Sequence, residues 1–561
     1  MAALFACCLL PFLIPLRTLP LPGFYAEWVA LATGLAAIPV LAMRSSLRVP
    51  RVAMLPAGLF VLLLLQLLWL PVGLRPTALI GLLYLFWTTL LMLATAALLH
   101  EISLPKLAGW LALALFLAAL LNALKALPVQ ALFGWPFPPA EAGANLGQVN
   151  LFADLLWLGV VSLLYRWQSA GRHGWRWATA LLPLLFASAL TGGRAPMLYA
   201  LWLILAAFVW GEARLKRAAV GTALLYFLIV AFVYWLALQQ GTAYAALAQH
   251  PDSLTRTLTD VQAGADGNVR LDLMAMAGSI FFAHPLFGAG WGSYPWASYS
   301  GAGHLGSAQA AAEHAHQFFF HLAAEMGMVG LVLALTAISL WMWPLWRDRL
   351  SLRGRPECWW AVTGAGVVLL HSQLEFPLWS AHFLGICAIL MTCAERCFVT
   401  CDRLRLSAAT LALTAAAGTY FLFGSGRDYV RLEQWIAHDM HRTGVQPSGD
   451  YYRVLVELSQ DSMLKAQAMR VLAAVMPPTA EHLEDKLGIC RYVLPSEPQA
   501  PAVFTCALLK GLAGDVASAD RDMHQASLVF GKFLPEYLDK LNVTLTPAER
   551  QALEPMLQHR D

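Results

Sequence analysis

Three histidines and an amide lie close together in the middle of the chain. The segment reads Glu313-His-Ala-His-Gln317, and His321 follows four residues later. Imidazole exchanges a proton near neutral pH, so His314 or His316 could act as a general base or contact a substrate. The same histidines could bind zinc, but this is not a common ligand spacing on a helix, and no strong carboxylate partner is obvious. A histidine held by backbone carbonyls is the structural alternative.

Arginines stand alone at two further positions that could hold an anion. Arg194 follows Thr-Gly-Gly, and Arg270 lies in a long polar segment. Residues 239–315 carry only two Lys or Arg against five Asp or Glu, so they form no general basic patch, and nucleic-acid binding has no support. The guanidinium of each arginine could bind phosphate oxygens through two parallel hydrogen bonds. Alternatively, the side chain could extend from a membrane helix to the lipid headgroups without binding a substrate.

Two motifs place polar side chains at the ends of apolar runs. One reads Asn145-Leu-Gly-Gln148-Val-Asn150, and its amides could bind a sugar or a diphosphate, or cap a helix. The other reads His371-Ser-Gln-Leu-Glu375-Phe-Pro. Ionisable side chains within a membrane span are costly and indicate a function by default.

Glycines 288, 290 and 292 imitate part of a nucleotide-binding fingerprint. No strand–helix–strand unit surrounds them, so that interpretation fails. We expect them instead to let the backbone turn tightly or approach another element.

The elements that position these residues are membrane helices. Of 561 residues, 59% are apolar and 13% are charged, against about 25% charged in a typical soluble domain. This composition excludes an ordinary soluble enzyme, a disordered chain and a collagen-like fibre, and it predicts an all-α polytopic membrane protein. Apolar runs of the required length predict about thirteen spans, near 2–17, 24–43, 52–70, 77–99, 107–127, 148–165, 177–191, 195–211, 218–238, 324–346, 358–376, 379–398 and 407–424.

The distribution of Lys and Arg predicts the orientation. Alternate short loops are rich in Lys and Arg, and the positive-inside rule assigns those loops to the cytoplasm. The N-terminus is then cytoplasmic, and the long loop at 239–323 and the C-terminal region lie outside, which in a bacterium is the periplasm. The apolar segment 274–287 is too short to span, so we expect it to lie in the interface or to re-enter.

The C-terminal region reads as a separate domain. We divide the chain into a transmembrane domain, 1–424, and a helical domain, 425–561, which holds 18 of the 34 acidic residues. Helices are predicted at 428–441, 451–476, 479–493, 500–513, 515–530 and 546–558. Cys490 and Cys506 are its only cysteines and either form a disulfide outside the cell or remain free. The domain could dock an acceptor protein or act as a structural cap.

Taken together, these motifs resemble the O-antigen ligase/polymerase superfamily. The resemblance rests on Gly147-Gln-x-Asn-x-Phe-Ala153, Thr191-Gly-Gly-Arg194, Arg270 with His284-Pro-Leu-x-Gly-x-Gly-Trp-Gly292, His314-Ala-His-Gln317 and His371-Ser-x-x-Glu-Phe-Pro-Leu378. The long C-terminal region makes the chain most similar to bacterial protein O-oligosaccharyltransferases of the pilin-glycosylating type. One departure is Gln317, where the family often has Asn.

The resemblance implies the reaction and its residues. A glycan would pass en bloc from an undecaprenyl-diphosphate carrier in the bacterial inner membrane to Ser or Thr hydroxyls of pilin or another periplasmic protein, with no cofactor and no required metal. It implies that His316 is catalytic and that Arg194 and Arg270 bind the diphosphate. It also makes the remaining polar residues of these motifs substrate-binding candidates, namely Gln148, Asn150, His314, Gln317, His371 and Glu375.

Two alternatives remain open. An O-antigen ligase acting on lipid A–core, or a repeat-unit polymerase, would share the donor chemistry. A transporter would instead require charged residues deep in the spans and inverted repeats. Asp154 is the only acidic residue well within one of the first nine spans.

Overall fold

A computed structural model gives the architecture of the chain. It describes residues 1–43, 46–127, 143–170, 179–238, 265–302, 312–401, 407–441 and 449–548, together with residues 550, 551 and 553. Parts of the predicted long loop, 239–264 and 303–311, and most of the predicted helix at 546–558 lie outside the described residues. The described residues are almost entirely helical, so the predicted all-α class is confirmed.

Every predicted span contains a helix. Among the residues that the structure describes, seven segments are long and apolar enough to cross a membrane, and the other helices among the predicted spans are shorter. The helices are α1 (Ala2–Leu13), α2 (Phe24–Leu35), α3 (Met54–Gln66), α4 (Arg75–Glu101), α5 (Leu104–Ala126), α7 (Val149–Ser169), α9 (Leu181–Leu190), α10 (Ala195–Trp210), α11 (Ala213–Leu238), α16 (Phe318–Arg347), α18 (Pro356–His371), α19 (Ala381–Ala394) and α20 (Ala408–Met440).

Two predicted boundaries are wrong. The last span was expected to end at 424, with a new helix from 428, but α20 is one helix of 33 residues. Only Ser, Gly and Arg separate the two segments, and one glycine costs a helix only about 1 kcal/mol, so nothing there ends it. In addition, α16 begins at Phe318 rather than 324 and is kinked at Gly327, whose φ is 65°.

The chain divides into two compact units. Unit 1 consists of 1–59, 84–266 and 333–419, and unit 2 of 60–83, 267–332 and 420–561. The domain boundary at 424 stays a prediction.

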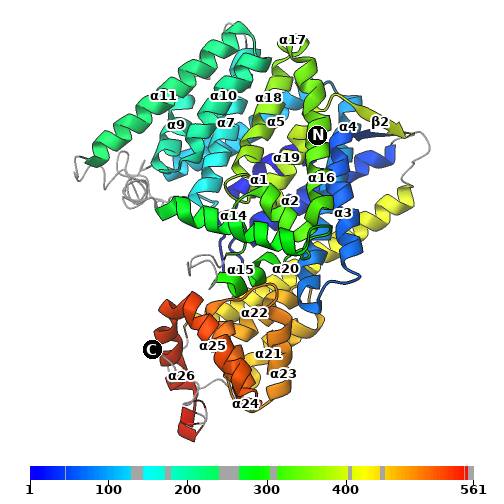
Figure 1. The fold of residues 1–561 in the computed structure, drawn as a ribbon. Coiled ribbons are helices and arrows are strands. Elements are labelled where there is room, and N and C mark those ends of the chain that lie inside the picture. The colour runs from blue at the N-terminus through cyan, green and yellow to red at the C-terminus, as the bar shows by residue number, and fades with distance from the viewer. Residues whose placement is uncertain are drawn as a thin grey trace. The chain divides into compact units, whose positions relative to one another are not determined.

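Unit 1 is a helical bundle built around α7. This helix packs against α5, α9 and α18 (Figure 1). Every residue from Phe152 to Tyr165 is buried. Gly159 contacts Ala119 of α5 so closely that a side chain would overlap it, as is common where membrane helices pack closely.

A small antiparallel sheet joins two distant loops of unit 1. Strand β1 (Leu47–Pro50) pairs with β2 (Phe398–Cys401), with Leu47 opposite Cys401. Both strands lie in Arg-bearing loops that the charge pattern assigns to the same side. Their pairing places the two loops at the same end of unit 1.

Unit 2 combines α14 and α15 with the C-terminal helices and with parts of α3, α4, α16 and α20. The elements of unit 2 not yet introduced are η3 (Val72–Leu74), α14 (Ala265–Ala283), α15 (Tyr294–Gly301), α21 (Gly449–Asp461), α22 (Lys465–Val475), α23 (Leu483–Val493), α24 (Ala500–Leu512), α25 (Val516–Phe530), η8 (Gly531–Phe533) and α26 (Leu534–Thr544). The predicted helix at 451–476 is in fact two helices, α21 and α22. The predicted segments 479–493, 500–513 and 515–530 contain α23, α24 and α25. Helix α26 was not predicted, although Pro535 in its first turn is compatible with a helix.

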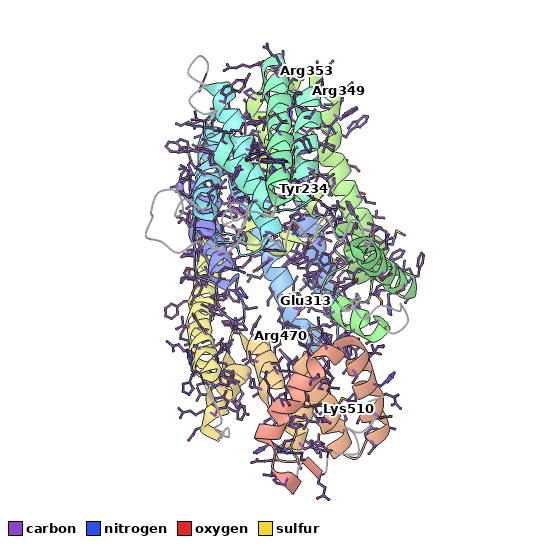
Figure 2. The ribbon with its side chains drawn as sticks, turned by 90° about the vertical axis from the view of Figure 1, so that its left-hand side faces the viewer. Tyr234, Glu313, Arg349, Arg353, Arg470 and Lys510 are labelled. Atoms are coloured by element: carbon purple, nitrogen blue, oxygen red, sulfur yellow. A yellow bond between two sulfur atoms is a disulfide. The ribbon has the colours of Figure 1, made fainter. Side chains whose placement is uncertain are left out.

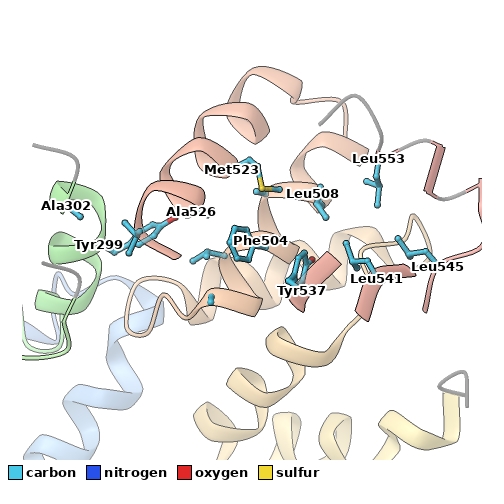
Figure 3. Packing of buried hydrophobic residues seen from close by; sticks show 14 residues of the cluster. Tyr299, Ala302, Phe504, Leu508, Met523, Ala526, Tyr537, Leu541, Leu545 and Leu553 are labelled. Carbon is cyan, nitrogen blue, oxygen red and sulfur yellow. The ribbon is translucent and has the colours of Figure 1, made fainter. Parts of the chain in front are cut away.

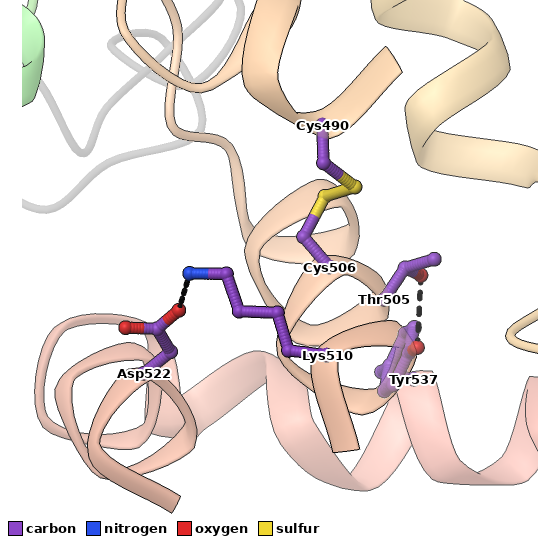
Figure 4. Close-up of a disulfide and its surroundings, with 6 residues drawn as sticks. All are labelled: Cys490, Thr505, Cys506, Lys510, Asp522 and Tyr537. Carbon is purple, nitrogen blue, oxygen red and sulfur yellow. Dashed lines mark hydrogen bonds and ion pairs between the residues drawn. A yellow bond between two sulfur atoms is a disulfide. The ribbon is translucent and has the colours of Figure 1, made fainter. Parts of the chain in front are cut away.

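One apolar core ties α15 to the C-terminal helices. Tyr299 and Ala302 pack in the same cluster as Phe504, Leu508 and Tyr537 (Figure 3). The Tyr299 ring also stacks on Phe530. In the same unit, Cys490 and Cys506 form a disulfide between α23 and α24 (Figure 4). Of the two alternatives for these cysteines, the structure therefore has the disulfide.

Candidate functional site

The predicted site residues fall into two groups, one in each unit. In unit 1, the motifs at 148–150, 191–194 and 371–375 meet where α7, α10 and α18 begin or end. In unit 2, the histidine motif lies immediately before α16.

Asn150 and Glu375 form the centre of the unit 1 group. The Asn150 Nδ2 donates a hydrogen bond to Glu375 Oε1 at 3.3 Å. The side-chain Oδ1 of Asn150 lies against Gly193, about 3.4 Å from where a Cβ would be. Gln148 precedes the first turn of α7 and is half-buried. The sequence motifs of three separate helices are thus brought together by contacts of the Asn150 amide.

Arg194 stands at the edge of this group. Gly192 has a φ of 65°, which lets the chain turn sharply between α9 and α10. Arg194 follows at the N-cap of α10, and its side chain is exposed. A guanidinium in this position is accessible to an anionic ligand.

His371 belongs to a buried triad with Asp154 and Tyr199. Its Nδ1 lies 2.5 Å from Asp154 Oδ2, and the Tyr199 hydroxyl donates to Asp154 Oδ1 at 2.5 Å. His371, Asp154 and Tyr199 are each fully buried. The Glu375 amide in turn donates to the His371 carbonyl at 2.8 Å, so the triad fixes the turn that carries Glu375. Neither Asp154 nor Tyr199 was predicted as a site residue.

In unit 2, His316 occupies an unusual backbone conformation. Its φ is 51°, in the left-handed region, which residues other than glycine rarely adopt. Its side chain is half-buried. Such conformations cost on the order of 1–3 kcal/mol and gather at functional sites, where surrounding contacts maintain them.

His321 and Glu325 supply those contacts. The Ala315 amide donates to His321 Nδ1 at 3.4 Å, and His321 Nε2 lies 3.5 Å from Glu325 Oε2. Since Nδ1 accepts a hydrogen bond, Nε2 carries the proton and points it at the carboxylate. The sequence analysis named no carboxylate partner for these histidines, and the structure pairs Glu325 with His321. The signal was the four-residue spacing of His321 and Glu325, which puts both on one helix face.

Glu325 also reaches a second element. Its Oε1 accepts a hydrogen bond from the Tyr294 amide at 3.1 Å, at the start of α15. The Tyr294 and His321 rings are 5.1 Å apart. One buried carboxylate therefore joins α15 to the turn before α16.

The other residues of the histidine motif have distinct surroundings. Gln317 Oε1 accepts a hydrogen bond from the Phe320 amide at 2.7 Å, so this side chain caps α16. The His314 ring packs edge-on against His321 at 5.2 Å. Burial, and then the neighbouring His321 and His316, hold the pKa of His314 well below its usual range. His314 therefore remains neutral at physiological pH.

The glycine-rich segment 285–292 docks on the kink of α16. The amides of Ala289 and Gly290 donate to the carbonyls of Ala324 and Glu325 at 2.9 and 3.1 Å. Gly288, Gly290 and Gly292 all have positive φ, and a Cβ on Gly288 would overlap the Glu325 backbone. The prediction that these glycines permit tight turns and close approach is confirmed.

Gln66 stabilises the junction between segment 285–292 and the kink of α16 by hydrogen bonds to both. Its Nε2 donates to the carbonyls of Phe287 and Glu325 at 2.7 and 2.9 Å, and its Oε1 accepts from the Trp291 amide at 3.2 Å. Gln66 is fully buried, and its only signal in the sequence is that it is a polar residue in an apolar run.

Arg270 lies on α14, which packs near the histidine motif. Met276, Ala277 and Ile280 of this helix share an apolar cluster with Ala315 and Ala324. Arg270 is exposed, seven residues before Ala277, a distance of about 10 Å along the helix axis.

Comparison with known families decides the relationship. Residues 179–335 match the family described as O-antigen ligase, and residues 359–557 match the family described as virulence factor membrane-bound polymerase, C-terminal. The chain belongs to the O-antigen ligase superfamily. The first match covers Arg194, Arg270 and the histidine motif, and the second runs from α18 through the C-terminal helices. No curated protein matches the chain.

Membership of the O-antigen ligase superfamily supports a multi-pass membrane enzyme that transfers glycans and uses a lipid-linked glycan. Within the described residues, no three His, Cys, Asp or Glu side chains gather as metal ligands do.

Proposed function

We propose that this O-antigen ligase superfamily member transfers a glycan en bloc from undecaprenyl diphosphate to Ser or Thr hydroxyls of a pilin or another periplasmic protein. The observation that carries the proposal is His316, held in a left-handed turn by the His321–Glu325 pair. An imidazole constrained in this way is suited to act on one defined proton.

The proposed reaction needs a base and a stabilised leaving group. His316 takes the proton of the acceptor hydroxyl while the oxygen attacks the anomeric carbon. The bond between that carbon and the diphosphate oxygen breaks, and the electron pair leaves with the lipid diphosphate. Arg194 and Arg270 are the groups we assign to the negative charge that grows there, since both guanidinium groups are exposed.

The remaining predicted residues take supporting roles in this proposal. Asn150 and Gln148 offer amides to sugar hydroxyls, and Glu375 orients Asn150 through their hydrogen bond. His371 is fully buried, so we assign it the positioning of the Glu375 turn. His314 packs beside His321 as a neutral ring, and Gln317 caps the start of α16 through its hydrogen bond with the Phe320 amide.

A second acceptor class has specific support. The two matching families are described as a ligase and a polymerase, and neither description mentions a protein acceptor. A sugar hydroxyl of lipid A–core or of a lipid-linked repeat unit would use the same base and the same cations.

A transfer assay with purified enzyme and a lipid-linked glycan distinguishes these acceptor classes. Pilin, lipid A–core and a second lipid-linked repeat are offered in parallel, and the products are measured by intact mass. We expect a mass increase of one whole glycan on pilin. Modification of lipid A–core alone, or growth of the lipid-linked glycan alone, would replace our proposal with the ligase or the polymerase.

A further inference from the structure

Unit 2 contains a cavity of about 1000 Å³ beside the histidine motif. Its wall includes Pro295 of α15 and Ala312 and Glu313, and the rest comes from the C-terminal helices. Glu313 lies three residues before His316, so their Cα atoms are at most about 11 Å apart. One wall residue of the cavity therefore lies within about 11 Å, Cα to Cα, of the proposed catalytic base.

The walls combine apolar rings with acidic groups. Six aromatic residues and five prolines line the cavity, together with five acidic residues and one lysine. Tyr451 and Tyr452 from α21 and the exposed Phe533 contribute rings. Such surfaces pack against apolar side chains and attract cations to their ring faces.

Most of the negative charge is not neutralised by local pairing. Arg470 pairs with Glu497 at 2.5 Å, and Lys540 pairs with Glu536 at 3.0 Å. The remaining three acids, Glu313, Asp439 and Asp539, form no ion pair with the described residues. Burial, together with the nearby charge of Glu313, raises the pKa of Glu497, although Arg470 opposes this shift. Glu313 and Arg470 are marked in Figure 2.

This charge distribution excludes the lipid diphosphate as the occupant. A diphosphate would meet like charge on several sides, whereas a basic side chain would be attracted. The volume is at the upper end of small-ligand pockets, and so it suits a short polypeptide segment.

We propose that this cavity binds a segment of the acceptor polypeptide that carries Lys or Arg among apolar residues, and so presents a neighbouring Ser or Thr to His316. The inference rests on the proposed function, in which the acceptor is a protein. It adds where the acceptor binds and which flanking residues it requires.

Charge reversal in the full-length enzyme tests this inference. The variant Asp439→Lys/Asp539→Lys changes two wall residues, and Asp520→Lys changes an exposed acid of α25 outside the cavity. Two versions of one Ser-containing peptide are compared, flanked by Lys or by Glu. We expect the double variant to raise KM for the Lys peptide about tenfold and to lower KM for the Glu peptide, because each altered charge changes binding by about 1.4- to 5-fold. The KM for the lipid-linked donor and kcat should stay unchanged, and Asp520→Lys should behave as wild type.

Three results would overturn the inference. They are an unchanged preference between the two peptides, a raised KM for the donor alone, and an equal effect of Asp520→Lys. If the double lysine variant does not fold, Asp439→Asn/Asp539→Asn serves instead, with an expected threefold increase in KM for the Lys peptide.

Direct binding separates this inference from the proposed function. Anisotropy of a fluorescent Lys-flanked peptide is measured without donor. Binding that is weakened in the double variant supports the cavity assignment even if no polypeptide is glycosylated, in which case only the proposed function fails. Absence of binding to the wild-type enzyme refutes the cavity assignment.

Discussion

At the scale of single residues, the turn that carries His316 depends on one buried carboxylate. Glu325 contacts both His321 and the Tyr294 amide, and His321 in turn accepts from Ala315, one residue before His316. Glu325 is therefore a positioning residue in our proposal. A base misplaced by about 1 Å can lose about a hundredfold in rate.

We predict that Glu325→Gln lowers kcat by about tenfold to a hundredfold. The amide keeps the shape and can still accept from Tyr294, but it removes the charge that faces His321 Nε2. The pH dependence of kcat should shift as well, since the electrostatics around the base change. Steady-state kinetics from pH 5.5 to 8.5 provide the measurement. A variant with lower thermal stability but wild-type kcat and pH profile would reduce Glu325 to a structural role.

Arg270 gives a second prediction at this scale. Arg270→Lys keeps the charge and loses the planar fork that binds two phosphate oxygens at once. We expect turnover to fall by at least about tenfold, while Arg521→Lys, an exposed control in α25, should have no effect. Full turnover of Arg270→Lys would mean that Arg270 only anchors its helix at the headgroups.

His314 predicts a pH effect on stability. Its pKa is lowered in the folded protein, whereas the unfolded side chain takes up a proton near pH 6.5. The neutral ring thus contributes stability above about pH 6.5 that is lost as the pH falls below that value. We expect Tm to fall between pH 7 and 5, and to fall less in His314→Asn. An identical fall of Tm with pH in the wild type and in His314→Asn would contradict a neutral His314 in the folded protein.

At the scale of elements, the glycine segment and the kink of α16 form one junction. Backbone hydrogen bonds pair 289–290 with 324–325, and positive φ at Gly288 and Gly327 allows the close approach. The sequence predicted the turns but not the partner, because two backbones that meet without side chains leave no pattern in either sequence.

We predict that Gly288→Ala weakens this junction and that Gly278→Ala does not. A Cβ at 288 would overlap the Glu325 backbone and occupy a strained φ, whereas the space around Gly278 in α14 is open. The loss at 288 should be on the order of 1–3 kcal/mol and should also reduce turnover. Thermal unfolding and transfer assays compare the two variants. Equal behaviour of both would show that the close contact is not required.

At the scale of the whole molecule, apolar runs located the membrane helices well. The lengths and spacing of these runs indicate the all-α class, because every backbone N–H and C=O group within the lipid must form a hydrogen bond inside the protein. The two helix errors have local explanations, because nothing between residues 424 and 428 ends α20, and Pro535 in the first turn of α26 is compatible with a helix. The motif residues were identified by type, but their partners Asp154, Tyr199 and Gln66 lie far away in sequence. A single chain gives no indication of such pairings.

The most direct test of the central claim is the intact mass of a pilin acceptor. The acceptor is co-expressed with a lipid-linked glycan and with the wild-type enzyme, His316→Ala or His524→Ala, the last being an exposed histidine in α25. We predict a shift of one whole glycan with wild type and His524→Ala, and loss of nearly all of that shift with His316→Ala at equal membrane levels. A full shift with His316→Ala would contradict the assignment of this histidine as the base.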